Sequence, residues 1–438
     1  MMERRSFGNC YKSYSKNSKV IVPYVRSIDK KLVVEELSNG ARISGEEHPG
    51  RDVGIVLVFP YGQLDHQYLS HMNEHLLFRN CGHSKEQAID VRIERLGGFY
   101  SGLTDKDSMT LLVKTLSENA RSAMRLIRKS MTDLNITEKQ LSLEKIIVEG
   151  ECLENRSDSK NCLMQSQEIM ALRNHPLYMP KELLKNIREL KLKQVIDHKI
   201  KYIGAKNLHI GIAGPNAKYL VESAAEIFSK LPNTGNDKHE FKKHKIKRVS
   251  RILYNSAANE SAVSILIPVA GYESNDQYGI ELLSHILTGA GRDYESRSRF
   301  WREIRAKRGS MYHTQSFYNP YNGIGLLEFF SYGITQKNSN SVRDIMLDEI
   351  AKLTTTLIPD HEFEDVRNSL LLTESRWIEN ETIEESAERI AASSFYNLNQ
   401  SFNPYRKKIL SLTPAKVYKV AKKYFDKSNL AIATIKAA

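Results

Sequence analysis

The chain has 438 residues, which is enough for two domains of ordinary size with a core in each. Its apolar fraction of 41% and charged fraction of 26% are those of a soluble globular protein, and no apolar run reaches the roughly 18 residues that a membrane span needs. The formal net charge of +12 is spread along the chain without a nucleic-acid-binding motif, so we expect neither a nucleic-acid partner nor a membrane.

The cysteines and the N-terminus bear on the compartment. Four cysteines without C-x-x-C spacing are too few for a disulfide framework in a chain of this length, which favours a reducing compartment. Residues 1–26 form a basic, acid-poor N-terminal extension without the apolar segment of a secretory signal. We therefore expect a cytoplasmic protein. The alternative is the mitochondrial matrix or a related organelle, because a basic, acid-poor N-terminus is also a feature of transit peptides.

The first strong patterns along the chain are a strand and a helix. Residues 53–62 read VGIVLVFPYG, an apolar and largely β-branched run closed by Pro and Gly, which predicts a buried strand. Residues 69–80 read LSHMNEHLLFRN and predict a helix. Its packing face would consist of Leu69, Met72, Leu76 and Leu77.

The next segments continue the alternation of helices and strands. Residues 84–98 predict a second helix that ends at Gly97-Gly98. Residues 99–116 predict two strands around a polar turn at 105–107, and residues 118–131 predict an amphipathic helix. Strands interspersed with helices indicate an α/β or α+β layered domain.

The helix at 69–80 carries His71, Glu74 and His75 on one face, because residues three and four apart are neighbours on a helix. Two imidazoles at this spacing can bind one zinc ion together with a third ligand from elsewhere in the chain. A helix predicted at 140–158 carries Glu144 and Glu151 two turns apart on one face. Single histidines are usually structural, but only about 0.02 His-x-x-Glu-His patterns are expected by chance here.

An internal repeat suggests how the chain is divided. The strand, glycine, turn and helix of residues 53–68 are echoed at 262–277, with Gly62 aligned to Gly271 at an offset of 209 residues (271 − 62). We predict two homologous domains at 27–235 and 251–438, joined by a polar linker at 236–250. At this offset the second half has Ile280, Leu283 and Ser284 in place of the motif, so it is expected to keep the fold and lack the site.

The His-x-x-Glu-His pattern is the inverted zincin motif, and with it the chain resembles the pitrilysin/insulinase-type zinc metallopeptidases (inverzincins), in their short-chain, processing-peptidase-like branch. That family has its third zinc ligand 76 residues beyond the second histidine, where this chain has Glu151, and a further glutamate seven residues earlier, where it has Glu144. The resemblance implies one zinc ion (Zn2+) per chain, bound by His71, His75 and Glu151. It makes Glu74 the general base and Glu144 a residue that orients a ligand or the water.

Two further segments resemble substrate-binding parts of the family. Residues 101–104 read SGLT, where the family has an N-A-x-T strand whose edge pairs with the substrate backbone, so Ser101 and Gly102 are predicted to bind substrate. In the second half, Arg305 and Tyr312 match an Arg and a Tyr seven residues apart that bind substrate near the scissile bond.

The resemblance implies an α+β fold of two homologous α/β sandwich domains, each an antiparallel-rich sheet covered by helices, which together form half of a clam-shell chamber. The implied function is a zinc-dependent endopeptidase that hydrolyses unfolded peptides. Because one chain carries both the zinc motif and the Arg/Tyr pair, we expect a homodimer, with a heterodimeric processing peptidase as an alternative. A rival of another class is a non-catalytic scaffold like the core proteins of the respiratory cytochrome bc complex.

Overall fold

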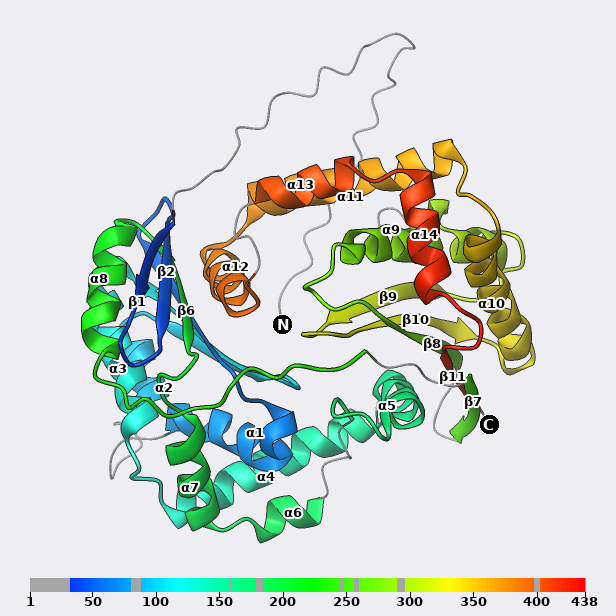
Figure 1. Cartoon of the computed structure of the whole chain (residues 1–438). Coiled ribbons are helices and arrows are strands. Elements are labelled where there is room, and N and C mark those ends of the chain that lie inside the picture. The colour runs from blue at the N-terminus through cyan, green and yellow to red at the C-terminus, as the bar shows by residue number, and fades with distance from the viewer. Residues whose placement is uncertain are drawn as a thin grey trace.

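The computed structural model describes residues 32–79, 88–157, 159–178, 184–243, 248–255, 260–289, 296–397 and 402–437. Two sheets, each covered by helices, lie side by side (Figure 1). The predicted α+β fold class, with two antiparallel-rich sheets, is therefore confirmed. The N-terminal extension predicted at residues 1–26 lies outside the described residues.

The first sheet has the strand order β1-β2-β6-β3-β5-β4. The central strand β3 (Asp52–Phe59) corresponds to the predicted apolar run and pairs antiparallel with both β5 and β6. The strand β2 pairs in parallel with β6. The other strands are β1 (Val33–Glu36), β2 (Arg42–Glu47), β4 (Phe99–Thr104), β5 (Met109–Leu116) and β6 (His209–Gly214).

The second sheet, β7-β11-β8-β10-β9, repeats this arrangement, and among the described residues it has no equivalent of β1. Its central strand β8 pairs antiparallel with β10 and β11, and β7 pairs in parallel with β11. The strand β8 begins 209 residues after β3 (261 − 52), so the repeat of the two sheets has the same offset as the sequence repeat. The strands are β7 (Val249–Asn255), β8 (Ser261–Val269), β9 (His313–Pro320), β10 (Gly325–Ile334) and β11 (Ala431–Ala437).

Helices cover both sheets. Of the helix predicted at 84–98, residues 84–87 lie outside the described residues, and α2 begins at Ile89 because Ala88 has an extended backbone (ψ 146°). In the first half the helices are α1 (Gln63–Arg79), α2 (Ile89–Arg95), α3 (Ala120–Thr132), α4 (Glu138–Ser157), α5 (Ser159–Leu172), α6 (Leu184–Glu189), α7 (Leu192–Tyr202) and α8 (Ala217–Phe228). In the second half they are α9 (Asp276–Thr288), η4 (Trp301–Ala306), α10 (Ser339–Thr355), α11 (Asp360–Asn380), α12 (Ile383–Phe395), α13 (Phe402–Leu410) and α14 (Pro414–Tyr424).

The two halves exchange covering helices. Although α12 belongs to the second half in sequence, it packs on β2, β3 and β6 of the first sheet, and α5 of the first half packs on β8 and β11 of the second (Figure 1). The approach of α12 depends on two glycines, because a Cβ at Gly54 would lie 2.6 Å from the Ile383 carbonyl oxygen and one at Gly211 would lie 2.2 Å from that of Ala387. Both faces of each central strand are thereby buried, which explains why the strand sequences are mostly apolar and lack polar alternation.

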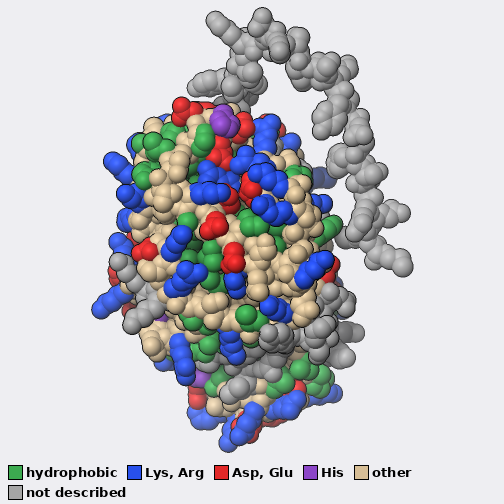
Figure 2. Space-filling view, turned by 90° about the vertical axis from the view of Figure 1, so that its right-hand side faces the viewer, with side chains coloured by type: hydrophobic (Ala, Val, Ile, Leu, Met, Phe, Trp, Pro, Cys, Tyr) green, Lys and Arg blue, Asp and Glu red, His purple; other side chains and the backbone are tan. Residues whose placement is uncertain are grey.

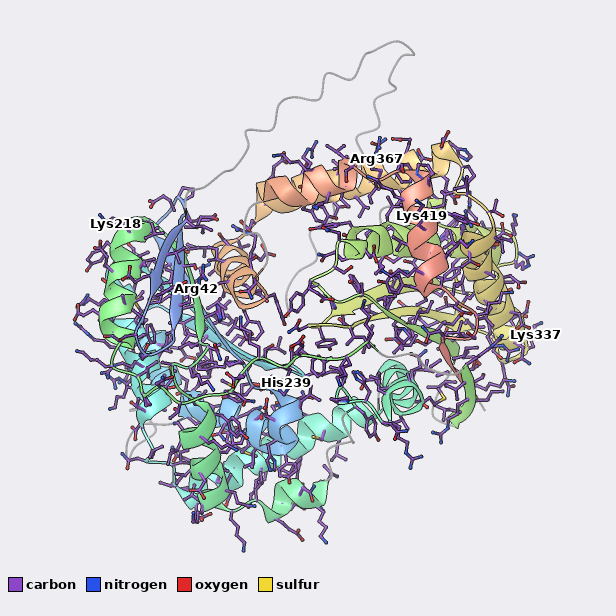
Figure 3. The ribbon with its side chains drawn as sticks, viewed as in Figure 1. Arg42, Lys218, His239, Lys337, Arg367 and Lys419 are labelled. Carbon is purple, nitrogen blue, oxygen red and sulfur yellow. The ribbon has the colours of Figure 1, made fainter. Side chains whose placement is uncertain are left out.

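A connecting segment fixes the N-terminal end of α1. Residues 236–243 run between the two sheets, and His239 of this segment points toward α1 (Figure 3). The His239 Nε2 atom lies 3.2 Å from Asp65 Oδ2, and Asn236 donates to the other oxygen of the same carboxylate. Asp65 also accepts the Gly62 N–H at 2.8 Å, so the first turn of α1 is anchored from both sides.

Two further features of the described residues are the apolar character of their helices and the distribution of charge on their surface. Among the described residues, none of the helices combines the length and apolar character that crossing a membrane requires. On the face shown in Figure 2, Lys and Arg side chains are interspersed with Asp and Glu side chains.

Candidate metal centre

Apolar packing sets the position of α1 against α4. Leu69, Met72 and Leu76 of α1 are buried and cluster with Leu141 and Val148 of α4. The fourth residue of the predicted packing face, Leu77, is also buried, in the core beneath the first sheet. Because side chains three and four positions apart share a face, this packing leaves the predicted motif on the side of α1 that meets α4.

The three predicted zinc ligands, His71, His75 and Glu151, meet between α1 and α4. His71 Nε2 lies 3.2 Å from Glu151 Oε2, His75 Nε2 lies 3.5 Å from the same oxygen, and the two Nε2 atoms are 3.3 Å apart. Ligand atoms around a tetrahedral zinc ion, with bonds of about 2.0–2.2 Å, are separated by roughly 3.3–3.6 Å. The donor types and their spacing therefore fit a zinc ion, and within the described ranges these residues alone form a group able to hold a metal.

The second glutamate of α4, Glu144, lies behind His75. Its Oε2 atom is 3.1 Å from His75 Nδ1, and its Oε1 atom is 3.2 Å from Nε of Arg79. A hydrogen bond from Nδ1–H to the carboxylate selects the imidazole tautomer whose Nε2 has a free lone pair, as a metal ligand requires. Arg79, which also pairs with Asp90, was not predicted, although it lies one helical turn after His75.

The predicted general base, Glu74, lies against the edge strand β4. Its Oε2 atom accepts a hydrogen bond from Thr104 Oγ1 at 2.7 Å. A Cβ at Gly102 would lie 2.5 Å from Glu74 Oε1, so a larger residue at position 102 would clash with the Glu74 carboxylate. Thr104 was not predicted to contact the base, but strand alternation places residues 102 and 104 on one face. Glu74 thus lies between the histidines of α1 and the strand predicted to bind substrate.

The charge state of Glu151 follows from its neighbours. A hydrogen bond with His71 and the nearby His75 hold the pKa of Glu151 below its ordinary value, against the opposing effect of partial burial. The side chain of Glu151 is 42% exposed, whereas that of Glu144 is only 6% exposed. The site therefore presents an ionised carboxylate and two imidazoles on a face that solvent reaches.

The predicted substrate-binding strand is accessible at its edge. The strand β4 is the last in the first sheet and, among the described strands, pairs only with β5. The Ser101 side chain is exposed and points to the opposite face from Gly102. The structure thus brings Gly102, but not the Ser101 side chain, toward Glu74.

The predicted Arg/Tyr pair lies in the other half of the chain. Arg305, in η4, donates to the carbonyl oxygen of Tyr312, and its guanidinium lies 5.3 Å from the centroid of the Tyr312 ring. The Tyr312 side chain is 64% exposed. The two residues are together, but η4 packs on β9 and α10 of the second half, whereas the metal ligands belong to α1 and α4.

In comparisons with known proteins, the two halves of the chain match two different family models. Residues 43–181 match the family model described as insulinase (peptidase family M16), and residues 189–370 match the one described as peptidase M16 inactive domain. The second match includes the positions where the repeat replaces the motif by Ile280, Leu283 and Ser284.

Individual relatives are distant. The chain is 24% identical over 379 residues to the mitochondrial ubiquinol-cytochrome-c reductase complex core protein I of Euglena gracilis, covering 77% of this chain and 73% of that protein. It is 23% identical over 355 residues to the uncharacterized zinc protease YmxG of Bacillus subtilis, covering 76% of this chain and 82% of that one. A protease from Helicobacter pylori has the same fold, with a TM-score of 0.81 and 18% identity over 93% of this chain and 99% of that chain. Two successive family models and a shared fold lead to one conclusion, that the chain belongs to peptidase family M16.

Proposed function

We propose that the protein is a zinc-dependent endopeptidase that hydrolyses unfolded peptides. The observation that supports this most directly is the triangle of His71 Nε2, His75 Nε2 and Glu151 Oε2, whose edges of 3.2–3.5 Å match ligand separations around zinc. Three protein ligands leave a fourth position for water or substrate, as catalytic zinc sites do.

The remaining residues of the site have distinct roles in this proposal. The zinc ion supplies Lewis-acid activation for the attack of water on the peptide carbonyl. Glu74 takes a proton from the attacking water and passes it to the leaving amine. Glu144 holds His75 in its ligating tautomer, as its bond to Nδ1 supports.

Substrate binding is assigned to both halves. The free edge of β4 pairs with the backbone of an extended peptide, with Ser101 and Gly102 at the point of contact. Arg305 and Tyr312 bind the substrate near the scissile bond, through the guanidinium and the exposed phenol. We propose that they act on the metal centre of a second chain in a homodimer. A heterodimer with a diverged partner is the alternative, since relatives include a protein named as the mitochondrial processing peptidase β subunit.

The compartment stays a prediction. The sequence favours the cytoplasm first, and the mitochondrial matrix or a related organelle is the alternative, since several relatives carry mitochondrial names.

The test separates the metal from the base. Glu74→Gln is expected to keep zinc at one ion per chain and to lose most peptidase activity, because an amide cannot accept the proton. His75→Ala is expected to lose both, because a ligand is missing. Zinc is measured by atomic emission after purification without chelators, and activity by mass spectrometry of a random peptide library. Normal turnover by Glu74→Gln would refute the mechanism.

The same experiment addresses the rival function. The relative in Euglena gracilis is named as a core protein of a respiratory complex, so a non-catalytic scaffold is the second candidate. A wild-type chain that contains no zinc and cleaves no peptide would favour the scaffold.

A further inference from the structure

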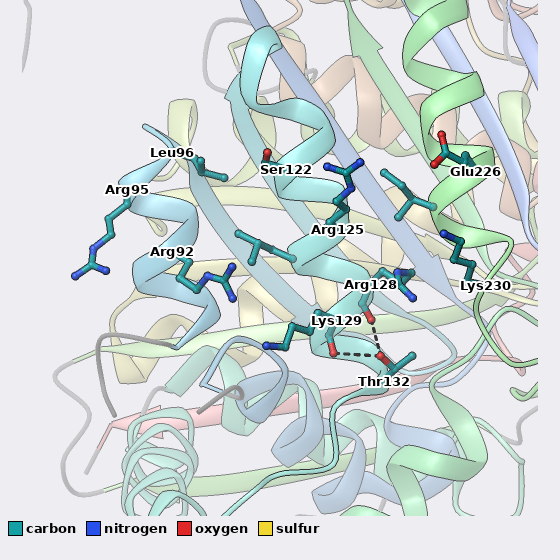
Figure 4. Close-up of a pocket in the computed structure, with 12 residues that line it drawn as sticks. Arg92, Arg95, Leu96, Ser122, Arg125, Arg128, Lys129, Thr132, Glu226 and Lys230 are labelled. Carbon is teal, nitrogen blue, oxygen red and sulfur yellow. Dashed lines mark hydrogen bonds between the residues drawn. The ribbon is translucent and has the colours of Figure 1, made fainter. Parts of the chain in front are cut away.

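A cationic pocket, away from the proposed metal centre, lies on the outer layer of the first half. It is formed by α2, α3 and the C-terminal end of α8, and its volume is about 630 Å³ (Figure 4). Leu96, Leu126 and Ile227 form its apolar part, and none of its lining residues is a predicted zinc ligand. Six of the twelve lining residues are cationic: Arg92, Arg95, Arg125, Arg128, Lys129 and Lys230.

Carboxylates balance only part of the positive charge of this pocket. Within the described ranges, no carboxylate forms an ion pair with Arg92, Arg125, Arg128, Lys129 or Lys230. The one acidic lining residue, Glu226, pairs with Arg121, which is not in the lining. The Nε atom of Arg128 is buried without a hydrogen-bond partner.

Such a cluster is unfavourable without a counter-charge. Arg125 and Lys129 are four residues apart on α3, where like charges repel. An anion that enters the pocket relieves the repulsion between these exposed cations.

The shape and chemistry of the pocket select the anion. Its volume lies within the roughly 300–1,000 Å³ of small-molecule sites, so it has room for a small soluble anion. Arg92 extends from α2 and Lys230 from the end of α8 toward α3, so cations from three elements contribute to the pocket (Figure 4). Guanidinium groups bind phosphate oxygens in pairs of parallel hydrogen bonds, and several cations favour several linked phosphates over one. None of the twelve lining residues is aromatic, so the pocket offers no ring on which a nucleobase stacks.

We propose that this pocket binds a small soluble polyphosphate and that it recognises the phosphate chain rather than any attached base. The site is independent of the proposed peptidase function. Inorganic tripolyphosphate and ATP, which share a chain of three phosphates, should therefore bind with affinities within a fewfold of each other.

The test uses the full chain and tripolyphosphate as the probe. Titration calorimetry should show binding that weakens as salt is raised, because the contacts are ionic. The double variant Arg125→Ala/Lys129→Ala removes two exposed cations of the pocket, so folding should be unaffected, and it should bind at least tenfold more weakly.

A matched control removes the same charge elsewhere. Lys337→Ala/Lys427→Ala replaces two exposed lysines of the second half, of which Lys337 is labelled in Figure 3, and should bind as the wild type does. Any zinc that tripolyphosphate extracts would be lost from both variants alike, so the comparison between them isolates the pocket.

Three results would overturn the proposal. They are no binding of tripolyphosphate by the wild type at 1 mM, equal weakening in the pocket and control variants, and binding to anionic phospholipid vesicles without binding of soluble tripolyphosphate. A loss confined to the pocket variant, together with binding of ATP at similar strength, would support it.

Discussion

Replacing Glu144 tests whether a residue outside the metal ligands controls zinc affinity. Glu144 accepts from His75 Nδ1 at 3.1 Å and pairs with Arg79, and its side chain is only 6% exposed. Glu144→Gln keeps the shape and one acceptor oxygen but removes the charge. Glu144→Leu removes the acceptor as well and leaves both partners without a carboxylate.

The size of each effect follows from these contacts. A hydrogen bond to a charged group contributes roughly 1.5–3 kcal/mol and a neutral one roughly 0.5–1.5 kcal/mol. In Glu144→Gln the hydrogen bond from His75 Nδ1 should therefore be weaker by about 1–1.5 kcal/mol. That corresponds to a zinc Kd roughly five- to tenfold higher. The zinc affinity of Glu144→Leu should be lower by about 10–100-fold, the range seen when the hydrogen-bond partner of a metal ligand is removed.

The assay is competition for zinc against a chelator of known affinity, which does not depend on peptidase activity. Glu149→Gln is the matched control, because Glu149 lies on the same helix and pairs with the largely exposed Arg188 at 3.1 Å. The control should bind zinc as the wild type does. Wild-type affinity in both Glu144 variants would refute the role assigned to Glu144.

Three further predictions concern pH, subunits and substrates. Burial, and next the charge of Asp105, raise the pKa of Asp107 from 3.8 to about 6, so the folded chain holds this proton more tightly than the unfolded chain. The free energy of unfolding should thus fall by roughly 2–2.5 kcal/mol as pH rises from 4 to 8, and should fall less in Asp107→Asn. Parallel curves of unfolding free energy against pH for the two proteins, from denaturant titrations, would contradict this. If Arg305 serves the metal centre of a partner chain, one of the two sites in a mixed dimer carries no substitution. Mixing inactive Glu74→Gln and Arg305→Ala homodimers under subunit exchange should then restore roughly a quarter of wild-type activity. If each site lies within one chain, no activity should return. Unstructured peptides of about ten to thirty residues should be cleaved and stable folded domains should not, because edge pairing with β4 needs an extended backbone; mass spectrometry of both substrate types decides.

Local patterns allowed the central strands and the candidate site to be predicted. The apolar run at 53–62 predicts β3 because a strand covered on both faces has no polar alternation, and the spacing of Leu69, Met72 and Leu76 predicts the packed face of α1. The resemblance pointed to Glu151, 76 residues after His75, and in the structure its carboxylate lies next to both histidines.

Properties that depend on three-dimensional packing were not predictable in this way. An amphipathic pattern shows that α12 has an apolar face but not which sheet that face covers, so the exchange of α5 and α12 between halves was missed. The contact of Thr104 with Glu74 joins a strand to a helix 30 residues away. The cations of the polyphosphate pocket, from Arg92 to Lys230, are ordinary surface residues in sequence and form a cluster only after folding.

The helix equivalent to α1 in the second half explains why, among the described residues, only the first half offers a candidate metal centre. In α9 the positions equivalent to the motif are Ile280, Leu283 and Ser284, and all three are buried. Burying an isoleucine or leucine side chain contributes roughly 1.5–3 kcal/mol, whereas imidazoles and carboxylates at such positions would need partners to offset their desolvation. The second half thus uses this face of the helix to stabilise its core. The first half leaves the same face half-buried against α4, where Glu144 and Glu151 supply those partners, so the polar motif costs little in stability and its nitrogen atoms stay accessible.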